Sequence, residues 1–143
     1  MNKTNSDQIQ LSIPNKPEYV SVARLTVTAI ANRMGFDIEG IEDIKVAIAE
    51  ACTNAITHGK NENDNFSVNF IMDEEKLTIT VCDHGMGCIV NNIKKPDFNH
   101  LNQEKEGGLG IFIIRSLMDD VQITSNHGIG TTITMTKYMG DGY

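Results

Sequence analysis

The sequence has no tryptophan, only three cysteines and no apolar run long enough to cross a bilayer. The cysteines (Cys52, Cys82 and Cys88) are odd in number, so they do not suggest a disulfide framework. Residues 1–10 are polar and lack the apolar centre of a signal peptide. We therefore expect a cytoplasmic protein that does not enter a membrane.

Basic residues are also scarce. Lysine and arginine number 12 against 19 acidic residues, which gives a net charge of −7. This balance argues against direct binding to nucleic acids or anionic membranes, which attract basic surfaces. If the ligand is a nucleoside triphosphate, its phosphates must be neutralised locally by a metal, helix N-termini or a few lysines.

The composition is that of an ordinary globular protein, because 40% of the 143 residues are hydrophobic. We expect one domain over residues 1–143, able to bury about 70% of its unfolded surface. Alternation of polar and apolar residues predicts strands, and a spacing of three or four predicts helices. The expected strands are 8–13, 66–72, 77–81, 121–125 and 131–138. The expected helices are 18–34, 39–58 and one that opens after glycines 107–110.

The first predicted helix carries more apolar residues than one narrow stripe needs. Val22, Leu25 and Ala29 widen its apolar surface. We assign them to the core, with a dimer or partner face as the alternative.

The second predicted helix carries the motif E-x-x-x-N, in which Glu50, Asn54 and His58 are each four residues apart. They form a polar stripe beside the buried stripe of the helix. Carboxylate and amide oxygens are ligands for Mg²⁺, and a carboxylate that does not bind metal can accept a proton. The alternative is a solvated edge of an amphipathic helix.

Two glycine-rich segments follow. Asp83 ends a strand and begins D-x-G-x-G, where an acid can accept a hydrogen bond from an adenine amine. Alone this motif is also an ordinary turn, and Cys82, His84 and Cys88 do not match common zinc spacings. Residues 88–106 lack periodicity, as in a lid or a surface loop. Gly107-Gly108-Leu109-Gly110 then opens a helix whose N–H groups can meet an anion.

The motifs E-x-x-x-N, D-x-G-x-G, G-G-L-G and a terminal G-x-G-T-T occur in one order. Together they resemble the nucleotide-binding boxes of the GHKL (histidine-kinase-like) ATPases, over nearly the whole chain. The resemblance implies a Bergerat fold. This is an α/β two-layer sandwich of the α+β type, with helices on one face of a mixed, mostly antiparallel sheet.

A narrower resemblance rests on five segments: Pro17-Glu18-Tyr19-Val20, Arg24-Leu25-Thr26, Ile41–Lys45, Glu50–Ala55 and Leu117-Met118-Asp119. They are similar to the RsbW family of anti-sigma-B factors and serine-protein kinases, and nearly as similar to the sporulation anti-sigma F kinases. Members bind a sigma factor and, in the other state, phosphorylate a serine of a STAS-domain anti-anti-sigma protein. They typically act as homodimers.

The resemblance implies a role for each matching residue. Glu50 would be the general base, Asn54 would ligate Mg²⁺, and Asp83 would bind the adenine amine of ATP. The remaining nucleotide-binding residues would be Gly85, Gly87, Lys105, Gly108, Leu109, Gly110 and Thr132, with residues 88–107 as the ATP lid. Lys105 is the candidate cation for the γ-phosphate, because Glu106 stands where the sporulation relatives have an arginine.

Other functions compete with this one. A kinase-inactive module would only bind a sigma factor, although both Glu50 and Asn54 are retained. The ATPase domain of a sensor histidine kinase would accompany a phospho-acceptor helix pair, which the sequence lacks. A gyrase- or MutL-type ATPase would need a transducer domain.

Overall fold

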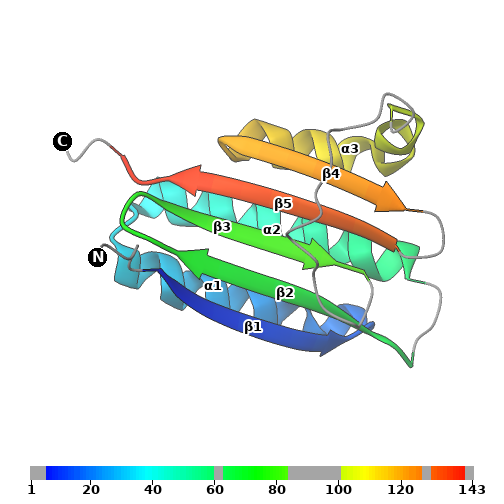
Figure 1. Ribbon diagram of the computed structural model, residues 1–143, viewed down its shortest axis with the longest axis horizontal. Helices are drawn as coiled ribbons and strands as arrows, with labels where there is room; N and C mark the ends of the chain where they lie inside the picture. The colour runs from blue at the N-terminus through cyan, green and yellow to red at the C-terminus, as the bar shows by residue number, and fades with distance from the viewer. Residues whose placement is uncertain (1–5, 60–62, 84–100, 127–129, 141–143) are drawn as a thin grey trace, which may run out of the picture.

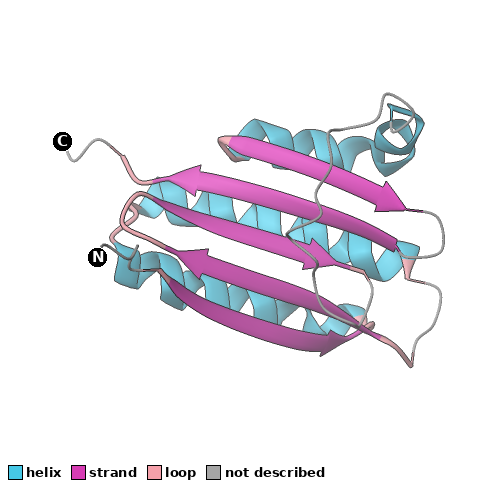
Figure 2. Cartoon of the chain, viewed as in Figure 1, coloured by secondary structure: helices cyan, strands magenta, loops and turns pink. Residues whose placement is uncertain are grey.

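Five strands form one antiparallel sheet, and three α-helices cover one of its faces (Figures 1 and 2). The computed structural model describes residues 6–59, 63–83, 101–126 and 130–140, with only the backbone described for 101–107 and 126. The strands are β1 (Asp7–Pro14), β2 (Asn65–Met72), β3 (Lys76–Cys82), β4 (Asp120–Asn126) and β5 (Gly130–Tyr138). Their order across the sheet is β1-β2-β3-β5-β4. The expected two-layer sandwich is confirmed, and every pairing among these strands is antiparallel rather than mixed.

The strands that the sequence predicts at 66–72 and 77–81 form a hairpin between β2 and β3. Asp73 begins the turn, and its Oδ1 accepts hydrogen bonds from the backbone N–H groups of Glu75 (2.8 Å) and Lys76 (2.9 Å). A short acidic side chain that bonds to its own turn favours a tight reversal. The reversal sets the register that pairs Met72 with Leu77.

The helices begin and end at residues suited to those positions. A 3₁₀ turn (Pro17–Tyr19) precedes α1 (Val20–Met34), which ends at Gly35 with φ 100°, a left-handed conformation that favours glycine. The α2 helix (Ile38–His58) starts after Asp37, whose Oδ1 accepts a hydrogen bond from Gly40 N at 2.8 Å. None of the described helices is both long and apolar enough to span a membrane.

The core lies between the sheet and the helices. Helix α2 packs against α1 on one side and α3 (Leu101–Leu117) on the other, so it is the central helix of its layer. The largest fully buried side chains are Phe66, Phe70, Ile44, Ile48, Leu77, Ile79, Ile114, Ile133, Met135, Val27, Val68 and Val81. Because α2 is held on three sides, polar residues on its flank have fixed positions.

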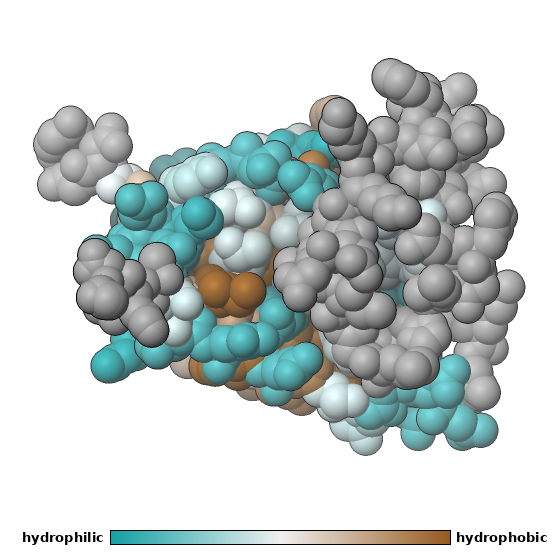
Figure 3. Space-filling view, viewed as in Figure 1, coloured by the Kyte–Doolittle hydropathy of each residue, from teal (hydrophilic) through white to brown (hydrophobic). Residues whose placement is uncertain are grey.

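The opposite sheet face carries mainly uncharged polar side chains. Figure 3 shows this face, where hydrophilic and intermediate colours surround a small hydrophobic area. Gln8 Nε2 donates to Asn69 Oδ1 at 2.9 Å, and the hydroxyls of Thr80 and Thr134 lie 3.4 Å apart. These contacts connect neighbouring strands through their side chains.

The assignment of the wide apolar surface of α1 to the core is wrong. Val22, Leu25 and Ala29 are all exposed, and Leu25 retains 71% of its accessible surface. The side of α1 that packs inward is formed by Val20, Ala23, Val27, Ile30 and Ala31. Helical periodicity therefore found the buried stripe, but it could not separate core from exposed apolar surface.

Cys52 is a free, fully buried cysteine of α2, and desolvation raises the pKa of its thiol from 9.0 to about 12. The folded state therefore holds the thiol proton more tightly, and stability falls as pH rises from about 9 towards 12. Cys52→Ala removes this dependence. We expect the difference in unfolding free energy between wild type and variant, measured in urea, to narrow by roughly 1 kcal/mol between about pH 8 and about pH 10. Parallel pH curves would contradict this expectation.

Candidate nucleotide and phosphoryl-transfer site

Three parts of the fold contribute the described site residues. Helix α2 supplies Glu50 and Asn54, the paired ends of β3 and β5 supply Asp83 and Thr132, and α3 supplies the second glycine-rich segment. In Figure 1, β3, β5, α2 and α3 are neighbours in the two layers. The topology therefore places motifs far apart in the sequence on adjacent elements.

Asp83 lies directly after β3, beside the start of β5. Its Oδ1 accepts a hydrogen bond from Thr131 N at 2.8 Å, and its own N–H donates to Thr131 O at 3.2 Å. Thr132 pairs with Cys82 in the ladder and directs its hydroxyl to Cys82 Sγ at 3.5 Å. The structure thus places Asp83 and Thr132 on neighbouring strand ends, and Thr131 holds Asp83 by one hydrogen bond to its half-buried carboxylate and one to its backbone N–H.

Thr131 is a contributor that the sequence reasoning missed. It acts through its backbone N–H and carbonyl, which any residue could supply, so its side chain carries no signal. The sequence feature that could have identified Thr131 is its position between Gly130 and Thr132, at the start of a strand that pairs with β3.

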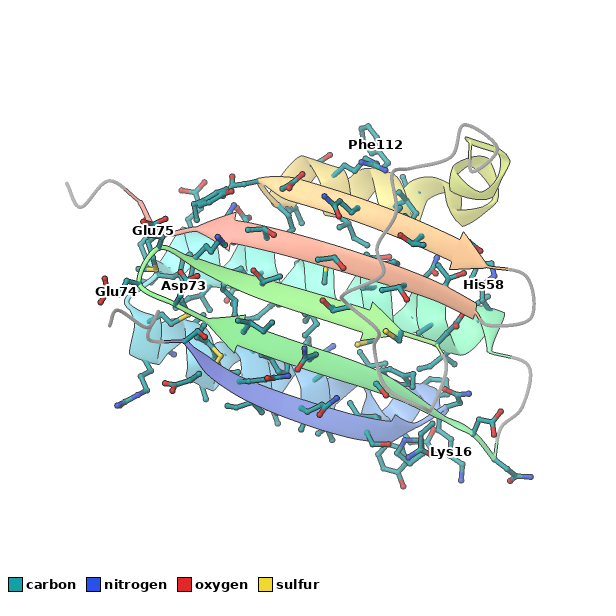
Figure 4. The ribbon with its side chains drawn as sticks, in the orientation of Figure 1. Lys16, His58, Asp73, Glu74, Glu75 and Phe112 are labelled. Atoms are coloured by element: carbon teal, nitrogen blue, oxygen red, sulfur yellow. The ribbon has the colours of Figure 1, made fainter. Side chains whose placement is uncertain are left out.

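Glu50 and Asn54 lie on consecutive turns of α2 and are both half-buried. The adjoining stripe, which includes Ile48, Ala51 and Ala55, is buried. This arrangement matches the predicted polar flank of a core helix rather than a fully solvated edge. His58 continues the stripe but is exposed at the last turn of α2, as Figure 4 shows.

Gly108 interrupts the third helix, and Gly110 lies where that helix packs against α2. Gly108 has φ 51° and ψ −122°, so it divides Leu101–Leu117 into two helical parts at a conformation that favours glycine. The helix begins at Leu101, before the glycine turn at which the sequence predicts its start. Its first part was not predicted because residues 101–106 show no helical periodicity. Gly110 packs against α2: a Cβ added there would lie 3.1 Å from Glu50 Oε1.

This close approach places the E-x-x-x-N motif of α2, which contains Glu50, beside the glycine-rich segment of α3. Glu50 is half-buried beside the backbone of Gly110, with the non-helical Gly108 two residues away. A carboxylate that can accept a proton therefore lies next to a glycine segment that lets a ligand approach the backbone. Leu109 lies between these two glycines, and its side chain is 72% exposed.

Several predicted site residues lie outside what the structure describes. Gly85 and Gly87 fall in the undescribed segment, as do residues 88–100 of the predicted lid. Residues 101–107 belong to the α3 backbone, and the Lys105 side chain is not described. Their roles remain predictions.

The described side chains do not build a protein-only metal cage, since no three of their His, Cys, Asp and Glu residues cluster suitably. Mg²⁺ typically binds through one or two protein oxygens together with phosphates and water, so Asn54 fits this mode.

The contact at Gly110 gives a direct test of the site geometry. Gly110→Ala places a methyl group 3.1 Å from Glu50 Oε1, which must shift by a few tenths of an ångström. We expect the rate of the predicted phosphoryl transfer to fall by roughly tenfold, since small displacements of a catalytic group are costly. Thermal stability should stay equal or rise, because alanine favours helix more than glycine.

Gly140→Ala is the matched control, because nothing lies within 4 Å of a Cβ at that position. Transfer rate and melting temperature should both stay at wild-type values. An unchanged rate in Gly110→Ala would show that the position of Glu50 does not limit the reaction.

Residues 13–137 match the histidine kinase-like ATPase domain family. The chain is 42% identical over 145 residues to the serine-protein kinase RsbW of Oceanobacillus iheyensis, covering 96% of this chain and 90% of that protein. It is 38% identical over 145 residues to the serine-protein kinase RsbW of Bacillus subtilis, with coverages of 96% and 89%.

A solved structure shares the fold. It contains the RsbU and RsbW domains of a Mycobacterium tuberculosis protein and superposes with a TM-score of 0.67 at 18% identity. The match covers 92% of this chain and 32% of that one, so it corresponds to one part of a longer protein. At this identity the likeness supports the fold alone.

Proposed function

Because the chain belongs to the RsbW serine-protein kinases of the histidine kinase-like ATPase family, we propose that it is an anti-sigma factor that switches partners by phosphorylation. It sequesters a sigma factor, and it transfers the γ-phosphate of ATP to a serine of a STAS-domain anti-anti-sigma protein. The observation that supports this most is the contact of Glu50 with the Gly110 segment.

The transfer step uses Glu50 as the general base. The serine Oγ attacks the γ-phosphorus, a new O–P bond forms, and the bond from the γ-phosphorus to the bridging oxygen breaks. ADP leaves with the electron pair of that bond, and the serine proton passes to the Glu50 carboxylate and then to solvent. Such a site contributes mainly by positioning and by neutralising charge.

The nucleotide is held by groups from each part of the site. Asp83 accepts a hydrogen bond from the adenine amine, and Thr132 contacts the base directly or through water. The glycines at 108 and 110 let backbone N–H groups approach the phosphates. Gly85 and Gly87 shape the pocket, and residues 88–107 close over the nucleotide.

The phosphates need local positive charge, because the chain carries a net charge of −7. Asn54 would hold Mg²⁺, and the metal would neutralise charge on the phosphates when it is bound. Lys105 supplies a further cation to the γ-phosphate.

The partner interactions complete the proposal. The chain acts in the cytoplasm as a homodimer, and it contacts its sigma factor and the STAS-domain protein directly. The exposed apolar residues of α1 (Val22, Leu25 and Ala29) give this assembly a surface that the core does not use.

Partner exchange tests this function. The purified chain is mixed with its sigma factor, and the complex is followed by size-exclusion chromatography in ATP and Mg²⁺. Unphosphorylated STAS-domain protein should displace the sigma factor, and the same protein recovered after phosphorylation should not. A sigma factor that never binds the chain would contradict the anti-sigma function.

A further inference from the structure

Lys137 of β5 connects the sheet to two helices. Its Nζ donates a hydrogen bond of 2.6 Å to the carbonyl oxygen of Leu117, the last residue of α3, and lies 3.7 Å from Oδ2 of Asp43 on α2. Lys137 pairs with the fully buried Leu77 in the ladder, so its side chain leaves the sheet on the face that the helices cover. One ammonium group therefore holds the end of α3 against α2.

The contact suits each of the three groups. The last carbonyls of a helix have no partner within the helix and lie at its negative end, so a cation there is favourable. Asp43 adds a second negative group, and solvent reaches this pair only in part, because the Lys137 side chain is 17% and the Asp43 side chain 30% exposed. The pair Lys45–Glu42, by contrast, joins residues three positions apart on α2 and connects no second element.

The Lys137 contact and the contact of Glu50 with Gly110 belong to one helix interface. Asp43 precedes Glu50 by seven residues, and Gly110 precedes Leu117 by seven residues. Seven residues are nearly two helical turns, which span about 10 Å along the axis and return to the same side of the helix within about 20°. The two helices therefore run antiparallel, with two contacts at matching spacings (Figure 1).

This spacing couples Lys137 to the position of the general base. A slide of α3 along α2 would move Gly110 relative to Glu50, and it would also break the bond at the Leu117 carbonyl. Gly108 interrupts the helix, so the segment that follows it depends on its own contacts for its position. The Lys137 contact fixes the far end of that segment.

We propose that Lys137 is a positioning residue for phosphoryl transfer, which keeps α3 in the register that places Gly110 against Glu50. This inference rests on the proposed kinase function, in which Glu50 takes the serine proton. Lys137 acts through the interface of α2 and α3, about 10 Å along the helices from the base. Small displacements of a catalytic group are costly, so the loss of this contact should be visible in the reaction rate.

The test uses Lys137→Met, which keeps the unbranched stem and removes the ammonium group. We expect kcat for transfer to a STAS-domain anti-anti-sigma protein to fall by roughly tenfold, whereas KM for ATP stays at the wild-type value. Lys137→Arg retains a cation that can donate to the Leu117 carbonyl, so it should restore most of kcat.

Lys76→Met is the matched control. It removes the same charge from a strand lysine whose partner, Asp73, lies 4.0 Å away in its own turn. Its kcat should equal that of wild type, because neither residue of this pair contacts a helix in the pair's own bond.

A double-mutant cycle with Glu50→Gln separates positioning from a general loss of stability. If Lys137 acts through Glu50, Lys137→Met should slow the chain that has Glu50 but cause no further loss in Glu50→Gln, because the base is already absent. An equal loss in both backgrounds, or a wild-type kcat in Lys137→Met, would overturn the proposal.

The amide resonances of Gly110 and Gly35 report the geometry without any transfer reaction. In two-dimensional amide NMR spectra, Lys137→Met should shift the Gly110 signal and leave that of Gly35, at the end of α1, unchanged. Lys137→Arg should return the Gly110 signal towards its wild-type position. If the wild-type chain transfers no phosphate, the kinase proposal is contradicted, while a shifted Gly110 signal still supports control of the helix register by Lys137. An unmoved Gly110 signal in Lys137→Met would overturn that control.

Discussion

We expect Glu50→Gln to slow phosphoryl transfer to the protein substrate by roughly 10²-fold or more, because the variant loses the proposed general base. Glutamine has nearly the same shape as glutamate, so it preserves the close packing against Gly110. It cannot take up the serine proton. ATP affinity and sigma-factor binding should stay close to wild type, because neither requires proton transfer.

Single-turnover transfer and equilibrium binding of ATP give the measurement. Glu42→Gln is the control, since it removes one negative charge from an exposed position of the same helix, where Glu42 pairs with Lys45 at 3.1 Å. Its transfer rate should equal that of wild type. Equal losses of transfer and of binding in Glu50→Gln would give Glu50 a structural role, and a wild-type rate would place the base elsewhere.

Asp83→Asn should weaken ATP binding by about 1.5–3 kcal/mol, the value of a hydrogen bond to a charged group. Asparagine retains an Oδ1 that can accept from Thr131 N, so the local strand geometry should persist. The substitution removes the negative charge that the adenine amine would face. Selectivity for ATP over GTP should also narrow, because an amide can donate to the guanine carbonyl where a carboxylate cannot.

Asp73→Asn provides the comparison for this variant. Asp73 also accepts backbone hydrogen bonds through Oδ1, but it does so in the turn at the other end of β3. Its replacement should leave ATP affinity unchanged in calorimetry. If Asp83→Asn binds ATP as tightly as wild type, Asp83 is not part of the nucleotide site.

Much of the fold follows from local patterns. Alternation located each described strand to within one residue at either end. Asp37 and Gly35 stand at helix ends because their residue types suit those cap positions. The position of β5 between β3 and β4 had no such local cause, because strand order depends on pairing between distant segments.

The site, like the fold, has features that follow from local sequence and features that depend on contacts between distant segments. The motifs around Glu50, Asp83 and Gly108 could be found in the sequence, because each needs particular residue types at close spacing. The contact between Glu50 and Gly110 could not be found, because it depends on how α2 packs against α3. The hydrogen bond from Thr131 to Asp83 spans 48 positions and uses the backbone, so no residue type announces it.

Exposure was the property that the sequence predicted least well. A helical stripe of apolar residues has the same appearance whether it packs inward or meets a partner. Leu25 on α1 and Phe112 on α3 continue apolar stripes, yet both are exposed. For such residues, the structure is needed to decide whether the side chain belongs to the core or is exposed to a partner.

The most direct test of the kinase function is the chemical identity of the phosphorylated residue. The purified chain is incubated with [γ-³²P]ATP, Mg²⁺ and a STAS-domain anti-anti-sigma protein, and the labelled product is analysed for phosphoamino acids. We expect phosphoserine on the STAS-domain protein, dependent on Mg²⁺ and greatly reduced with Glu50→Gln. Bound ATP with no labelled partner, or label on a histidine, would contradict it.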